Sequence, residues 1–150
     1  MKATFGMGCF WKGELIFSKI PGVTKTEVGY MGGSNSEDRV TYEKVCSGKT
    51  ENAEVIQITF NKDKITYKAL LDLFWIKHNP TTSNRQGFDI GKQYRSIIFY
   101  HNEEQKKAAK KSLNEEQKRL KRKIVTKIKN AKKFHKAEEY HQKYLEKKSI

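Results

Sequence analysis

A strand that runs directly into a cysteine constrains this chain most strongly. Residues 3–7 have the apolar character of a buried strand, and Gly8 and Cys9 follow at once. A helical pattern begins immediately afterwards, with apolar residues at 15–17. The sequence therefore predicts that Cys9 lies at the turn where a strand becomes a helix.

This position is expected to make the thiol of Cys9 more reactive than that of a cysteine buried in the core. Backbone N–H groups at a helix start have no partner within the helix, and the helix dipole places partial positive charge there. A thiol at that place is expected to ionise more readily, and the thiolate is the nucleophile. Phe10 and Trp11 follow directly and would put an apolar aromatic surface beside the sulfur. The alternative is that Cys9 is only a small apolar side chain buried in an aromatic core.

The rest of the chain alternates strands and helices without the strict order of a doubly wound sheet. We expect further strands over 23–31, 53–60, 95–100 and 124–128, and helices from Thr66 and over 103–121 and 136–145. Residues 41–47 are expected to form a helical turn, and residues 79–91 a loop. This order predicts an α+β fold, in which helices pack on a mixed β-sheet as a two-layer α/β sandwich of ferredoxin-like kind. The length predicts a single catalytic domain over 1–150.

The composition of the chain indicates in which cellular compartment the protein is expected. No apolar run is long enough to cross a membrane, and the first residues lack the apolar stretch of a signal peptide. Two cysteines cannot build a disulfide framework for 150 residues. We therefore expect a cytoplasmic protein with no membrane partner.

The positive charge gathers in the last third of the chain. The formal net charge is +14, and residues 101–150 carry 17 Lys and Arg against 7 Asp and Glu. A basic nucleic-acid-binding domain is the alternative function that this pattern raises. Lysine dominates over arginine, and no aromatic residues are interleaved with the basic run over 118–129. We therefore do not expect nucleic acid as the main partner.

Four further residues are candidates to meet the cysteine: Tyr42, Glu54, Asp89 and Tyr94. Glu54 stands among apolar strand residues, where burial would raise its pKa and make it a proton donor near neutral pH. An exposed position at a strand edge is the alternative for this carboxylate. The histidines show no metal-ligand spacing with the cysteines, so no zinc site is expected. A different thiol enzyme, such as a peroxidase or a Cys–His protease, stays open.

An ordered series of short motifs resembles the A-type peptide methionine sulfoxide reductases over nearly the whole chain. The motifs are Gly8-Cys9-Phe10-Trp11, Pro21-Gly22-Val23, Gly29-Tyr30, Gly32-Gly33, Thr41-Tyr42-Glu43, Ala53-Glu54-Val55, Phe74-Trp75, Asp89, Gln93-Tyr94-Arg95-Ser96 and the run from Ala137 to Gln142. A single cysteine–aromatic motif would be weak, but the whole series in order is specific.

The resemblance implies a function for each candidate. Cys9 resembles the nucleophile that attacks the sulfoxide sulfur and becomes a sulfenic acid. Glu54 resembles the acid that protonates the sulfoxide oxygen. Tyr42, Asp89 and Tyr94 resemble the groups that orient that oxygen. The resemblance also implies that the enzyme acts on the S epimer of free and peptide-bound methionine sulfoxide, with no metal and no organic cofactor.

The resemblance also bears on the aromatic pair Phe10 and Trp11 and on the second cysteine, Cys46. Phe10 and Trp11 resemble the pocket for the substrate S-methyl group. The sequence departs from the pattern at Lys12 and Asn52, and no cysteine follows Cys46. Cys46 is thus the only possible resolving cysteine, and we expect instead a one-cysteine cycle in a monomer. A thioredoxin- or glutaredoxin-type reductant would complete it.

Overall fold

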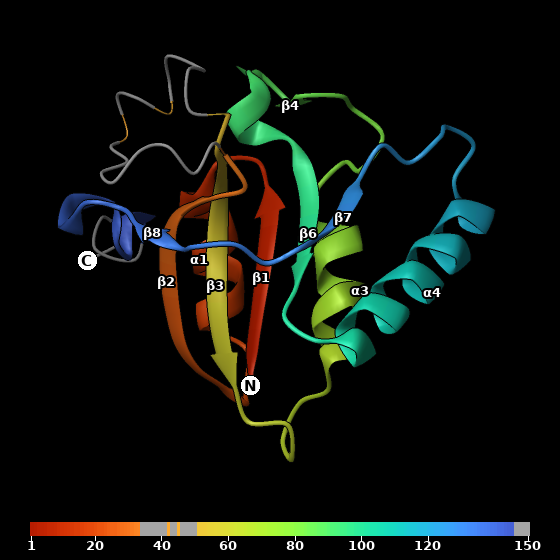
Figure 1. The fold of residues 1–150 in the computed structure, drawn as a ribbon, viewed down its shortest axis with the longest axis horizontal. Helices are drawn as coiled ribbons and strands as arrows, with labels where there is room; N and C mark the ends of the chain where they lie inside the picture. The colour runs from red at the N-terminus through yellow and green to blue at the C-terminus, as the bar shows by residue number, and fades with distance from the viewer. Residues whose placement is uncertain (34–41, 43–44, 46–50, 146–150) are drawn as a thin grey trace.

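A mixed six-stranded sheet forms the centre of the protein, described here from a computed structural model (Figure 1). The structure describes residues 1–33, 42, 45 and 51–145. The sheet strands are β1 (Lys2–Met7), β2 (Val23–Met31), β3 (Ala53–Phe60), β6 (Ser96–Tyr100), β7 (Lys127–Asn130) and β8 (His135–Lys136). The helices are α1 (Phe10–Ser18), α3 (Tyr67–Lys77) and α4 (Glu103–Arg119), with 3₁₀ helices η1 (Lys92–Tyr94) and η2 (Glu139–His141). A separate hairpin joins β4 (Arg85–Gln86) to β5 (Asp89–Ile90).

The strand order is β7-β6-β1-β3-β2-β8, and only β6 and β7 pair in parallel. The predicted α+β class with a mixed sheet is therefore confirmed. Strand β1 lies between β3 and β6, so the strand that leads to Cys9 is held on both sides. Such a central strand gives a rigid base for the turn that follows it.

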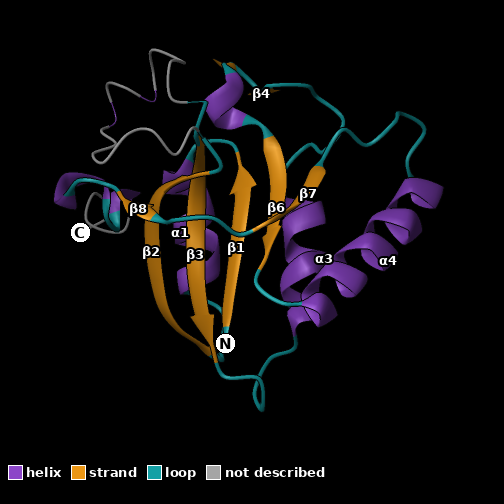
Figure 2. Cartoon of the chain, in the orientation of Figure 1, coloured by secondary structure: helices purple, strands orange, loops and turns teal. Residues whose placement is uncertain are grey.

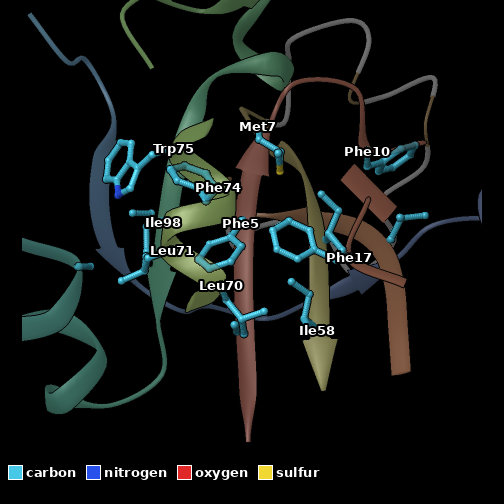
Figure 3. Packing of buried hydrophobic residues seen from close by; sticks show 14 of the residues in the cluster. Phe5, Met7, Phe10, Phe17, Ile58, Leu70, Leu71, Phe74, Trp75 and Ile98 are labelled. Carbon is cyan, nitrogen blue, oxygen red and sulfur yellow. The ribbon is translucent and has the colours of Figure 1, made fainter. Parts of the chain in front are cut away.

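Different elements cover the two faces of the sheet (Figure 2). Helices α1 and α3 lie on one face, where Phe5 of β1 packs its ring 5.7 Å from Phe17 and 5.0 Å from Phe74 (Figure 3). The chain between β7 and β8 crosses the opposite face, where Ala131 and Phe134 pack on a second apolar cluster. Both faces are thus buried, which explains why nearly every residue of β3 is buried.

Most predicted elements are confirmed with small shifts at their ends. Thr66 caps α3 as expected, because its hydroxyl accepts a hydrogen bond from the N–H of Ala69 at 3.1 Å. Strand β7 begins three residues later than predicted. In α4 and at its C-cap, Ala108, Leu113 and Leu120 face inward as expected and pack, partly buried, against the core. The helix also buries Gln105, Ala109 and Ser112. The 79–91 loop contains the β4–β5 hairpin, and the helical turn expected over 41–47 falls largely outside the described residues.

The predicted helix over 136–145 is wrong. Its first residue belongs to β8, and its centre forms the short η2. The side chain of Gln142 is hydrogen-bonded to both the N–H and the carbonyl of Val28, at 2.9 and 2.8 Å. Lys143 has a φ of 53°, which an α-helix does not allow. Pairing with the edge of β2 therefore overrides the local helical pattern.

Candidate active site

Cys9 lies where the sequence predicts, between the end of β1 and the first turn of α1. Gly8 makes the turn with a φ of +97°, and a Cβ there would meet the side chain of Gln86 at 2.8 Å. Only glycine fits this position, because a side chain would both strain the backbone and displace the β4–β5 hairpin. The turn thus brings the hairpin against the backbone beside the cysteine.

The ionisation of Cys9 differs from the sequence expectation. The backbone N–H groups of Trp11 and Lys12 favour the ionised sulfur and so lower the pKa of the thiol. Burial acts more strongly, and the carboxylates of Glu54 and Asp89 add to it, so the pKa of Cys9 rises to about 11. In the free protein at neutral pH, Cys9 therefore carries its proton.

Glu54 is a buried acid and not an exposed strand-edge carboxylate. Glu54 lies on β3 and is 1% exposed. One oxygen, Oε1, accepts the backbone N–H of Phe10 at 3.3 Å, and the other, Oε2, has no hydrogen-bond partner among the described residues. Burial raises the pKa of Glu54 to about 8, because a desolvated carboxylate is disfavoured. Glu54 therefore holds a proton at neutral pH and can donate it.

Asp89 extends this group from the β4–β5 hairpin. It is half-buried, and its negative charge raises the pKa of both Cys9 and Glu54. The hairpin is anchored by Gln86, whose side-chain oxygen accepts the N–H of Asn79 at 2.9 Å. The structure thus brings Cys9, Glu54 and Asp89 together from three separate parts of the chain.

The two aromatic residues after Cys9 have different environments. Phe10 is fully buried, with its ring 5.8 Å from that of Tyr30. Trp11 is half-buried, and its indole N–H donates to Nδ1 of His141 at 3.0 Å. The indole also stacks on the ring of Tyr144 at 3.9 Å. Of the pair, only Trp11 presents an accessible aromatic surface.

Sequence reasoning missed the part that the C-terminal segment plays here. His141 is 2% exposed and packs against both Phe10 and Trp11. Its ring also lies 4.5 Å from that of Tyr42, whose backbone N–H donates to Glu138 at 3.4 Å. The motif from Ala137 to Gln142 was the available signal, but a helix pattern alone could not show that it folds back onto α1.

The other predicted site residues are Tyr42, Tyr94 and Cys46. Tyr42 lies in the aromatic cluster around His141, and Tyr94 closes η1, which contacts β3. Cys46 lies outside the described residues.

The ring of His78 is fixed by hydrogen bonds and is neutral. Its ring bonds to the carbonyl of Phe74 and, through Nε2, to the hydroxyl of Ser96 at 2.7 Å. Burial lowers the pKa of His78 to about 4, so the ring is neutral. Within the part of the chain that the structure describes, no three His, Cys, Asp or Glu side chains gather as metal ligands. In that same part, no helix is long and apolar enough to cross a membrane.

Known proteins are similar to this chain in both sequence and architecture. The family model described as peptide methionine sulfoxide reductase matches residues 1–150. The peptide methionine sulfoxide reductase MsrA of Methanothermobacter thermautotrophicus is 55% identical over 148 residues, which cover 97% of this chain and 86% of that protein.

Two solved structures are also similar. Reduced Mxr1 from Saccharomyces cerevisiae superimposes with a TM-score of 0.95 at 40% identity, over 99% of this chain and 86% of that one. Mxr1 in complex with Trx2 gives a TM-score of 0.67 at 27% identity, over 96% and 84% of the two chains. With the family model matched from end to end and relatives above half identity, the chain belongs to the A-type peptide methionine sulfoxide reductases, oxidoreductases that reduce methionine sulfoxide.

Proposed function

We propose that Cys9 attacks the sulfur of the S epimer of methionine sulfoxide, in free or peptide-bound form, and takes up its oxygen as a sulfenic acid. The observation that carries the proposal is the buried carboxyl of Glu54 beside a thiol at a helix start. A pKa raised to about 8 keeps that carboxyl protonated at neutral pH. A sulfoxide oxygen needs such a proton to leave sulfur.

The proposed step balances without an outside proton. Sγ of Cys9 bonds to the substrate sulfur while Glu54 donates its proton to the sulfoxide oxygen. The hydroxyl then passes from the substrate sulfur to Sγ, so the substrate's sulfur–oxygen bond and the temporary sulfur–sulfur bond both break and methionine leaves. The thiol proton passes to the carboxylate that Glu54 has become. The substrate sulfur is reduced by two electrons, and the Cys9 sulfur is oxidised by two, which is the first rung of cysteine oxidation.

The other site residues receive orienting and binding functions in this proposal. Tyr42, Tyr94 and Asp89 would orient the sulfoxide oxygen, because hydroxyls and a carboxyl can bind it or its water by hydrogen bonds. Phe10 and Trp11 would form the apolar surface for the S-methyl group. The half-buried indole of Trp11 supports a direct contact, and the full burial of Phe10 supports a wall behind it.

Recycling is proposed to need one cysteine of this chain. An external thiol would attack the Cys9 sulfenic acid, and the resulting mixed disulfide would be resolved by a thioredoxin- or glutaredoxin-type protein. The complex of the related Mxr1 with Trx2 supports a thioredoxin-type reductant. A resolving function of Cys46 is the less favoured alternative.

Several broader expectations accompany this function. Strands β6, β1, β3 and β2, with α1 and α3 between them in sequence, support the ferredoxin-like description of the core. We propose that residues 1–150 act as one catalytic domain that repairs proteins under oxidative stress. Its cytoplasmic location and monomeric state stay predictions.

Turnover of the separate S and R epimers of methionine sulfoxide, with dithiothreitol as reductant, tests the proposal. We expect methionine from the S epimer only, and none from a Cys9→Ser variant. Reduction of the R epimer at an equal rate, or full activity of Cys9→Ser, would show that the proposed site is wrong.

A further inference from the structure

Two adjoining hollows extend from Cys9 across the protein surface. The first, of about 360 Å³, is lined by Cys9 and Lys77 among others, with the β4–β5 hairpin as one wall. The second, of about 900 Å³, lies between the C-terminal ends of α3 and α4. Both have Lys77 and His78 in their walls, so they adjoin, and together they form what we call the flanking groove.

The flanking groove carries an excess of positive charge. Its cationic lining residues are Lys12, Lys77, Arg119, Lys121 and Arg122. The two carboxylates in the second hollow already have partners: Asp72 pairs with Lys68 at 3.2 Å, and Glu116 pairs with Arg119. Asp89 lies at the Cys9 end of the groove. The neutral ring of His78 adds no charge at pH 7.

Exposed apolar side chains accompany these cations. Phe88 lines the first hollow and is fully exposed, and Ile76 lines the second and is 67% exposed. The loop that carries Phe88 is fixed, because the N–H of Gly91 donates to the carbonyl of Asn84 at 2.9 Å. The hairpin therefore holds the backbone of Phe88 at the edge of the groove.

The position of the groove decides what can occupy it. Consecutive residues of a polypeptide lie about 3.8 Å apart, so the neighbours of a methionine sulfoxide held at Cys9 fall within reach of the first hollow. Residues further along the substrate reach the second hollow, because the two hollows adjoin at Lys77 and His78. We propose that the flanking groove binds acidic residues next to an oxidised methionine in a polypeptide substrate. The proposal rests on the attack by Cys9 described above.

Three peptides test this charge preference. Each contains one central S-methionine sulfoxide, flanked on both sides by Glu, by Gln or by Lys, and dithiothreitol serves as the reductant so that no second protein is present. Exposed ion pairs are individually weak. We therefore expect kcat/KM to be about tenfold higher for the Glu peptide than for the Lys peptide at low salt, with the ratio shrinking at high salt.

Charge reversal identifies the groove as the cause. In Lys77→Glu and Arg122→Glu, the ratio of the Glu peptide to the Lys peptide should fall to about one or below. Lys62→Glu makes the same change of net charge in the exposed turn between β3 and α3, at the opposite end of α3 from the groove, and should keep the ratio. Lys12 is left unchanged, because it lines the same hollow as Cys9 and a glutamate there would place a new carboxylate beside the reacting sulfur.

The outcomes separate this inference from the proposed function. Free methionine sulfoxide has no flanking residues and gives the reference rate of each variant. Equal kcat/KM for all three peptides, or equal ratios in Lys77→Glu and Lys62→Glu, would overturn the groove while the reference rate still stands. An effect of Lys77→Glu that appears only when a thioredoxin-type protein replaces dithiothreitol would also overturn it. Loss of the reference rate in the unmodified protein would refute the proposed function itself.

Discussion

The backbone N–H of Phe10 donates to Oε1 of Glu54 across 3.3 Å and so joins the first turn of α1 to the start of β3. Phe10 directly follows Cys9, so this bond fixes the carboxyl relative to the nucleophile. It also occupies one carboxyl oxygen and leaves Oε2 for another group. The proposed acid is therefore positioned by the same turn that positions the thiol.

Replacing this acid should slow the reduction step without affecting access to the thiol. In Glu54→Gln, the amide keeps the size of the side chain but cannot release a proton to the sulfoxide. General acids contribute about 10²–10⁴-fold, and we expect a loss of that order in single turnover with S-methionine sulfoxide. The rate of Cys9 alkylation by a small electrophile serves as the control. Unchanged turnover would remove Glu54 from the mechanism.

The raised pKa of Glu54 predicts a specific pH profile. Because this pKa is about 8, the protonated form dominates at neutral pH and is lost above pH 8. Cys9, with a pKa of about 11, stays protonated up to about pH 10 and gives up its proton only within the step. The single-turnover rate should therefore be level below pH 7 and fall about tenfold per pH unit well above pH 8. Glu54→Gln should lack this decline. A wild-type rate that rises steadily from pH 6 to pH 10 would contradict the assignment.

Trp11 should contribute to substrate binding through its accessible indole. In Trp11→Ala, we expect KM for methionine sulfoxide to rise, because a methyl contact in an apolar pocket is worth about 1–3 kcal/mol. Steady-state kinetics measure the effect, and thermal unfolding shows whether the fold survives. If KM and kcat both stay at wild-type values, Trp11 is only part of the core.

His141 should act through Trp11. His141→Phe keeps a buried ring but removes the acceptor of the indole N–H, a bond worth about 0.5–1.5 kcal/mol. We expect KM to rise a few-fold, whereas Cys9 alkylation stays unchanged. His141→Gln keeps an acceptor and should recover part of the loss. Equal KM in both variants would show that the hydrogen bond does not position the indole.

The longer strands and the setting of Cys9 and Glu54 could be predicted from the sequence, because local pattern decides them. The alternation over 53–60 gives β3 with its correct ends, and the apolar neighbours of Glu54 correctly indicate its burial. The cysteine between a strand and a helix is likewise a local pattern. Each of these features needs only neighbouring residues.

Features that depend on distant contacts could not be predicted in the same way. The segment around Gln142 has a helical pattern, but its hydrogen bonds to Val28 hold it along β2. The position of His141 against Trp11 follows from that pairing. The helix start alone suggests a lowered pKa for Cys9, but burial beside two carboxylates reverses the direction. Only the folded chain shows how strongly each of these opposing effects acts.

One measurement tests the attack by Cys9 most directly. The reduced protein is mixed with one equivalent of S-methionine sulfoxide, without a reductant but with a dimedone-type trap, and the products are identified by mass spectrometry. We expect one equivalent of methionine, the trap on Cys9 and a free thiol on Cys46. Absence of methionine, a trap on Cys46, or a stoichiometric Cys9–Cys46 disulfide would contradict it.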